Sequence, residues 1–96
     1  MIVSFTAQLW QWDARRNDTW MFVTLPAGES QEIREHTAGP RRGFGSVRVR
    51  VTIGATTWQT SVFPEGEHYV LPVKRAVRTA EDLDVGDEAS VRIELL

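Results

Sequence analysis

The stretch Ser46-Val-Arg-Val-Arg-Val-Thr-Ile53 decides the fold class, because apolar and polar residues alternate along it without interruption. A period of two places the valines and the isoleucine on one face of a β-strand and the polar residues on the other. Gly54 and Ala55 follow as a tight turn into a second strand at residues 56–62. The stretch therefore predicts antiparallel strands with one face buried in a core.

Further strands are predicted on both sides of this pair. Residues 2–12 alternate in the same way, and their polar face ends in Trp10 and Trp12. Residues 19–25 are apolar on both faces, which is typical of a more fully buried strand. Short strands follow at residues 68–73 and 89–95. The pattern predicts a mainly-β protein.

Two short helices are expected between these strands. Residues 29–37 are good helix formers, but Ile33 is their single large apolar residue, so this helix is predicted to lie on the surface. Pro72 suits the first position of a second helix, which places Lys74 in the first helical turn. Its buried stripe follows the i, i+3, i+4, i+7 spacing through Val73, Ala76, Val77 and Ala80.

The expected architecture is a small closed barrel of about six antiparallel-rich strands with two short helices, forming one domain over residues 1–96. Closing the barrel is the simplest way for so short a chain to hide its sheet edges. The predicted core consists of Val3, Phe5, Leu9, Val23, Val47, Val49, Val51, Val77, Val91 and Ile93.

Composition excludes several functional classes. The formal net charge of −2 argues against general nucleic-acid binding, which needs a basic field. The chain has no cysteine, so disulfides, thiolate nucleophiles and cysteine-ligated zinc are excluded. No stretch approaches the roughly 20 apolar residues that span a bilayer, and no signal peptide is recognisable. We expect a cytoplasmic protein that binds neither membrane nor cofactor.

Several motifs occur together along the chain. They are Trp20-x-Phe22-Val23-x-Leu25-Pro26, Arg42-Gly43-x-Gly45-Ser46-Val47, Trp58-x-Thr60-Ser61-x-Phe63-Pro64, Tyr69-x-Leu71-Pro72-Val73-Lys74-x-x-Val77-Arg78 and Val85-Gly86-Asp87. In this combination the chain resembles the small β-barrel domains of unknown function (DUF type) found in bacteria and archaea. In some proteins a bacteriocin-protection-type domain follows such a domain, and we expect the present chain to be a stand-alone member. The resemblance implies a barrel with short helices and no established activity.

The C-terminal part also resembles a second class of protein. Leu71-Pro72-Val73-Lys74 with Arg78, followed by Leu83-x-Val85-Gly86-Asp87, is similar to the swapped-hairpin domains of transition-state regulators and antitoxins. Those proteins are dimers that bind DNA. The alternative function is therefore a dimeric nucleic-acid-binding domain, although the acidic net charge makes nucleic acid an improbable partner.

The strongest candidate site is a basic group formed by Arg41, Arg42, Lys74 and Arg78. Lys74 is predicted near a helix N-terminus, where the macrodipole disfavours a cation, and Lys74 and Arg78 are like charges four residues apart. A bound anion would compensate both costs, with Ser61 as a further hydroxyl donor. The alternative is that Arg78 pairs with Asp82 and Lys74 is solvated, as surface charges commonly are.

Other candidates are weaker. Trp10 and Trp12 could form an exposed aromatic platform, whereas Trp20 and Trp58 are expected in the core. Ser61 and Thr60 with His68 lack the nucleophile elbow of a hydrolase, and His36 and His68 stand alone, without metal-ligand spacing.

The function expected from the sequence is a small binding module for an anionic ligand or a protein partner. The candidate ligand-binding residues are Arg41, Arg42, Ser61, Lys74 and Arg78, with no catalytic residue and no metal ligand. An enzyme is disfavoured because no acid–base constellation is present. A monomer and a homodimer both agree with the sequence.

Overall fold

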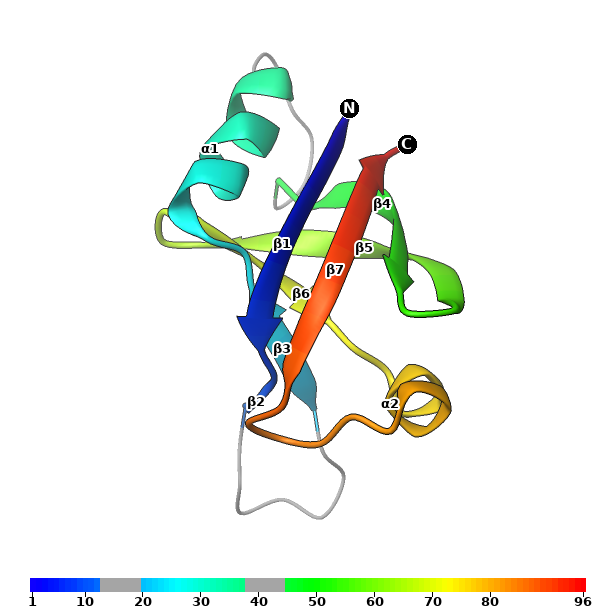
Figure 1. Ribbon diagram of the computed structural model, residues 1–96. Helices are drawn as coiled ribbons and strands as arrows, with labels where there is room; N and C mark the ends of the chain where they lie inside the picture. The colour runs from blue at the N-terminus through cyan, green and yellow to red at the C-terminus, as the bar shows by residue number, and fades with distance from the viewer. Residues whose placement is uncertain (13–19, 38–44) are drawn as a thin grey trace.

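The computed structural model describes residues 1–12, 20–37 and 45–96. Its elements, in chain order, are β1 (Ile2–Gln8), β2 (Trp10–Gln11), β3 (Met21–Thr24), α1 (Ala27–His36), β4 (Val47–Ile53), β5 (Thr56–Glu65), β6 (His68–Pro72), α2 (Arg75–Glu81) and β7 (Glu88–Leu95). The strands form one antiparallel sheet in the order β1-β7-β4-β5-β6-β3-β2. The sheet curls into a half-barrel, with α1 and α2 near opposite ends of the molecule (Figure 1).

The two edges of this sheet are consecutive pieces of one chain segment. β1 pairs with β7 and β2 pairs with β3, and only Leu9 separates β1 from β2. The Leu9 amide donates to the Asp87 carbonyl at 2.9 Å, and the Gly86 amide donates to the Leu9 carbonyl at 2.8 Å. The Leu9 side chain is 1% exposed. This junction explains why the described residues form seven strands in place of about six, since the predicted strand over residues 2–12 changes partner at Leu9.

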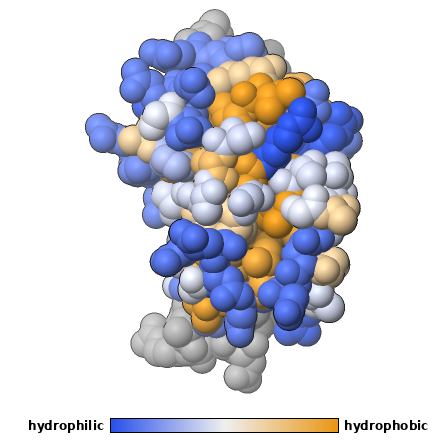
Figure 2. All heavy atoms as spheres, in the orientation of Figure 1, coloured by the Kyte–Doolittle hydropathy of each residue, from blue (hydrophilic) through white to orange (hydrophobic). Residues whose placement is uncertain are grey.

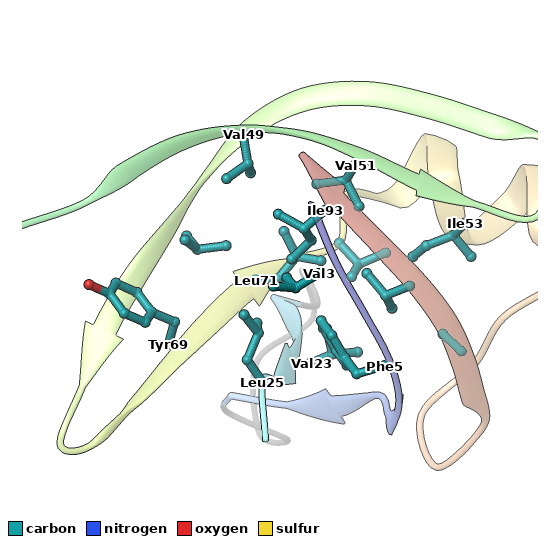
Figure 3. Packing of buried hydrophobic residues seen from close by; sticks show 14 of the residues in the cluster. Val3, Phe5, Val23, Leu25, Val49, Val51, Ile53, Tyr69, Leu71 and Ile93 are labelled. Carbon is teal, nitrogen blue, oxygen red and sulfur yellow. The ribbon is translucent and has the colours of Figure 1, made fainter. Parts of the chain in front are cut away.

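The core contains the residues that the alternation predicted, but the predicted buried stripe of the second helix is wrong at Ala76 and Ala80, which are exposed. All ten predicted core residues are buried. Val49 and Val51 point from β4 toward Ile93 and Leu71 inside the half-barrel (Figure 3). β4 can present this buried face because it lies between β5 and β7, with ladders on both of its edges. The expectation of a mainly-β barrel-like fold with two short helices is confirmed.

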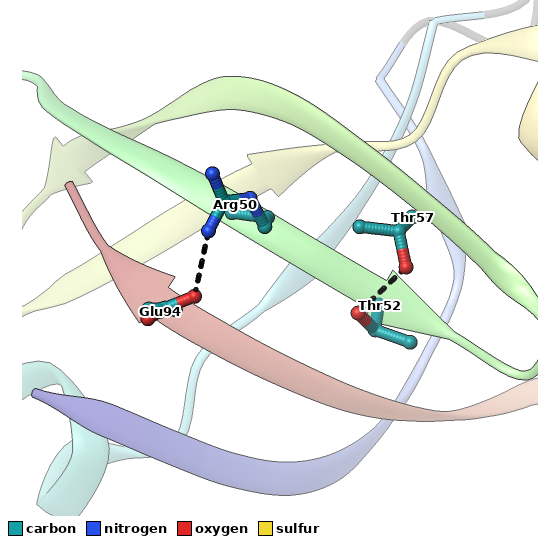
Figure 4. Close-up of polar contacts among 4 residues, drawn as sticks. All are labelled: Arg50, Thr52, Thr57 and Glu94. Carbon is teal, nitrogen blue, oxygen red and sulfur yellow. Dashed lines mark hydrogen bonds and ion pairs between the residues drawn. The ribbon is translucent and has the colours of Figure 1, made fainter.

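The outer face of the same strands is polar. Arg50 on β4 forms an ion pair with Glu94 on β7 at 3.0 Å, and the hydroxyls of Thr52 and Thr57 are 3.0 Å apart (Figure 4). On the face that carries β1 and β7, hydrophilic and near-neutral side chains cover most of the surface, with apolar groups visible between them (Figure 2). The period-two pattern of the sequence thus separates core from solvent along the sheet.

Helix α1 is attached more firmly than the sequence suggested. Besides Ile33, the helix buries Ser30 completely. The Ser30 hydroxyl donates to the Leu25 carbonyl at 3.2 Å and accepts the Tyr69 amide at 3.0 Å. One hydroxyl therefore joins the end of β3, helix α1 and β6. A serine in a helix that is predicted to lie on the surface gives no indication of this role.

The start of α2 differs from the prediction. Pro72 is the last residue of β6, where it pairs with Phe22, and the Val73 amide donates to the Met21 carbonyl at 2.9 Å. These contacts keep the chain extended, so the helix begins at Arg75 with Lys74 as its N-cap. Lys74 precedes the first helical turn, and the predicted placement inside that turn was wrong.

Replacing Val49 with aspartate is expected to unfold the protein. Val49 is fully buried, and an unpaired buried carboxylate costs several kcal/mol against a total stability of about 5–15 kcal/mol. The matched control is Arg48→Asp, one residue away on the exposed face, which should keep a cooperative transition. Thermal melts followed by circular dichroism check both variants. A Val49→Asp melt at the wild-type temperature would contradict the core assignment.

Ser30→Ala is expected to lower the free energy of unfolding by about 1–3 kcal/mol, because it leaves the buried Tyr69 amide without its acceptor. The exposed Ser90→Ala should change it by less than about 0.5 kcal/mol. Urea unfolding of the two variants makes the comparison. Equal effects of the two substitutions would show that Ser30 does not join α1 to β6 energetically.

Candidate functional site

A cavity of about 490 Å³ lies where β6 leads into α2, next to the start of β3 and the middle of β5. This volume is in the range of small-molecule sites, about 300–1,000 Å³. The lining residues are Trp20, Met21, Trp58, Gln59, Thr60, Pro72, Val73, Lys74, Arg75 and Arg78.

The charged side chains of this lining all have the same sign. Lys74, Arg75 and Arg78 come from one short segment, and no described lining residue is a carboxylate or a histidine. The first turn of α2 contains no acidic residue, so nothing in that turn offsets the unfavourable interaction of Lys74 and Arg75 with the helix dipole. Lys74 and Arg78 are also like charges at i, i+4. The cavity therefore presents a positive rim.

Arg78 is the most firmly held of these cations. Its Nε donates to the Val73 carbonyl at 3.1 Å, and its Nη1 lies 3.4 Å from the Met21 sulfur. The side chain is half-buried, whereas Lys74 and Arg75 are exposed. The guanidinium is thus oriented by β3 and by the chain leaving β6.

Two tryptophans form the aromatic part of the lining, and only one of them lies in the core. Trp58 is 9% exposed, as expected, but Trp20 is 59% exposed, so its predicted core position was wrong. Trp20 precedes β3 and shares a face with Phe22 and Thr24, opposite the buried Met21 and Val23. The apolar character of residues 19–25 on both faces concealed this alternation.

Trp20 belongs to a row of aromatic rings on the outer side of β2 and β3. Its ring centroid is 6.4 Å from that of Phe22, and Phe22 stacks on Trp10 at 5.1 Å. Trp10 is further fixed by its Nε1, which donates to the Thr24 hydroxyl at 2.9 Å. Phe22, on the paired strand, therefore covers one face of the Trp10 ring. The row ends with Trp20 at the cavity.

The structure brings together part of the predicted basic group. Lys74 and Arg78 line the same cavity, and Arg41 and Arg42 lie outside the described residues. Ser61 is elsewhere, since its hydroxyl accepts from Arg48 Nη1 at 3.4 Å across the β4–β5 ladder.

Three polar or charged lining residues were not among the predicted ligand-binding residues. Thr60 takes the place predicted for Ser61, because neighbouring strand residues point to opposite faces and Thr60 shares the face of Trp58 and Val62. Arg75 was missed although it directly follows Lys74, and Gln59 carried no signal in the sequence.

No group of three His, Asp or Glu residues that could hold a metal ion occurs in residues 1–12, 20–37 and 45–96. His68 Nδ1 is engaged with the Leu25 carbonyl at 2.9 Å, at the opposite end of β6 from Lys74. The cavity itself offers cations, one hydroxyl and one amide, a set suited to holding a ligand.

Fold and site together define a small antiparallel β half-barrel with two short helices and a cationic, aromatic cavity. The chain belongs to the family described as a domain of unknown function, DUF1905, whose model matches residues 5–93. This match confirms the resemblance to DUF-type β domains and assigns no activity. No curated protein matches the chain. Among the described residues, no helix is long and apolar enough to cross a membrane.

Proposed function

We propose that the protein is a small binding module that takes an anionic ligand in the cavity beside α2. The observation that carries this proposal is the lining itself: Lys74, Arg75 and Arg78 line one side of a cavity of about 490 Å³, and no described lining residue is acidic. Guanidinium and ammonium groups form charge-assisted hydrogen bonds with phosphates and carboxylates, and these bonds are the strong ones in proteins.

The arrangement is more favourable with an anion than without one. Three like charges on a five-residue segment repel one another, and the helix dipole disfavours the two that lie at its start. A bound anion offsets both the repulsion between the cations and their unfavourable interaction with the helix dipole. Arg78 is already oriented by Val73 and Met21, so ordering its side chain on binding costs less than for a free arginine.

A small ligand fits this geometry better than nucleic acid does. The cations border a cavity, whereas duplex binding needs a basic surface that follows a backbone. The swapped-hairpin alternative stays a prediction from the C-terminal sequence. A protein partner and a cytoplasmic location stay predictions from the sequence.

The proposal predicts a ligand-dependent thermal shift that needs Lys74. Pyrophosphate at about ten times its dissociation constant should raise the melting temperature by several degrees. Lys74→Gln should at least halve that shift, while the variant alone melts at or slightly above the wild-type temperature because one repulsive charge is gone. Differential scanning calorimetry with and without pyrophosphate measures both effects.

Arg92→Gln is the matched control, because it also removes one exposed positive charge but lies on β7, outside this cavity. Its pyrophosphate shift should equal that of the wild type. Identical shifts in Lys74→Gln and Arg92→Gln would indicate nonspecific screening and contradict the proposed site, as would the absence of any shift in the wild type.

A further inference from the structure

The cation rim accounts for only one side of the cavity. The other walls are largely apolar, with Gln59 and Thr60 as polar residues, and they include the exposed indole of Trp20 together with Trp58, Met21 and Pro72. An anion such as phosphate makes no use of such surfaces. A tryptophan that is 59% exposed at the edge of a hollow leaves a large apolar area in water, and covering that area is favourable.

Trp20 is held in place before any ligand arrives. Its carbonyl accepts the Trp12 amide at 2.9 Å, which continues the β2–β3 pairing beyond the ends of both strands. Its ring lies against Phe22, which in turn stacks on Trp10. Rigid aromatic side chains supply contact area with little loss of conformational entropy, so Trp20 is a pre-formed stacking platform.

The aromatic and cationic walls come from different elements. Trp20 and Trp58 belong to the β3 and β5 sides of the cavity, and the cations belong to the segment 74–78. A ligand that satisfies both walls must carry an apolar planar part and an anionic part at separate ends. Gln59 and Thr60, on the β5 side, can hydrogen-bond to heteroatoms of a ring.

From this division we infer that the ligand is a planar ring bearing a phosphate-type anionic group, of the size class of a nucleoside monophosphate. The ring stacks on the Trp20 indole and the anion lies at Lys74 and Arg78. This inference rests on the proposed function, because it specifies the ligand class for the same cavity. A single nucleotide requires no extended basic surface, so the acidic net charge of the chain does not oppose it.

The test is a series of three probes that share one phosphate group. Inorganic phosphate carries no ring, phenyl phosphate carries a single six-membered ring, and AMP carries a larger purine ring. Isothermal titration calorimetry should give about tenfold tighter binding of phenyl phosphate than of phosphate, and AMP should bind at least as tightly as phenyl phosphate. Trp20→Ala should remove this gain in affinity from the ring. The affinity of the variant for inorganic phosphate should stay within about twofold of the wild-type value. Trp20→Phe, which keeps a planar ring, should restore most of the gain.

Trp12→Ala is the matched control, because Trp12 is equally exposed at 60% but does not line the cavity. The Trp12→Ala variant should retain the full gain in affinity for the ring-bearing probes over inorganic phosphate. Equal affinities for all three probes would overturn the ring-bearing ligand and leave the anion site standing. A ring-dependent gain that survives Trp20→Ala would overturn the stacking position. No binding of any probe would overturn the inference and the proposed function together.

Discussion

The junction at Leu9 is the constraint on which the other features depend. One residue carries the chain from the β1–β7 ladder to the β2–β3 ladder, with a buried side chain and with both backbone polar groups bonded to the turn at residues 86–87. The two edges of the sheet are thereby tied together, and the sheet must curl around the core (Figure 1). The same junction sets the position of β2 beside β3. The Trp12 amide then fixes the Trp20 carbonyl and so places the indole at the cavity.

Alternation in the sequence was sufficient to predict the core and most strands, because burial on one face of a sheet is a local, period-two property. Leu9 shows where this reasoning stops. A change of ladder partner leaves the alternation intact, so residues 2–12 read as one strand although they form two. Pro72 shows the same limit: the proline suits a helix start, but pairing with Phe22 keeps it in β6. Long-range pairing decided both cases, and a local pattern does not carry that information.

The sequence predicted the charged residues Lys74 and Arg78 of the candidate site, but it did not predict the hydroxyl and aromatic side chains that line the rest of the cavity. Lys74 and Arg78 could be joined because four residues span one helical turn, whatever the surrounding fold. Thr60 and Ser61 differ by a single position: Thr60 shares the face of Trp58 and Val62, whereas Ser61 pairs with Arg48 on the opposite face of β5. Trp20 is expected in the core from its residue type, because tryptophan is usually well buried. Its exposure follows from β3 having one face on the core and the other on the aromatic row.

Lys74 is the only lysine in the chain, and this allows the central claim, an anion held at the cavity rim, to be measured directly. The measurement is the rate at which a limiting amine-reactive acylating reagent modifies Lys74, followed by mass spectrometry, with the Met1 α-amine as internal reference. Saturating pyrophosphate should slow modification of Lys74 severalfold and leave that of Met1 unchanged. Equal slowing at both amines, or no change at Lys74, would contradict an anion site at this end of the half-barrel.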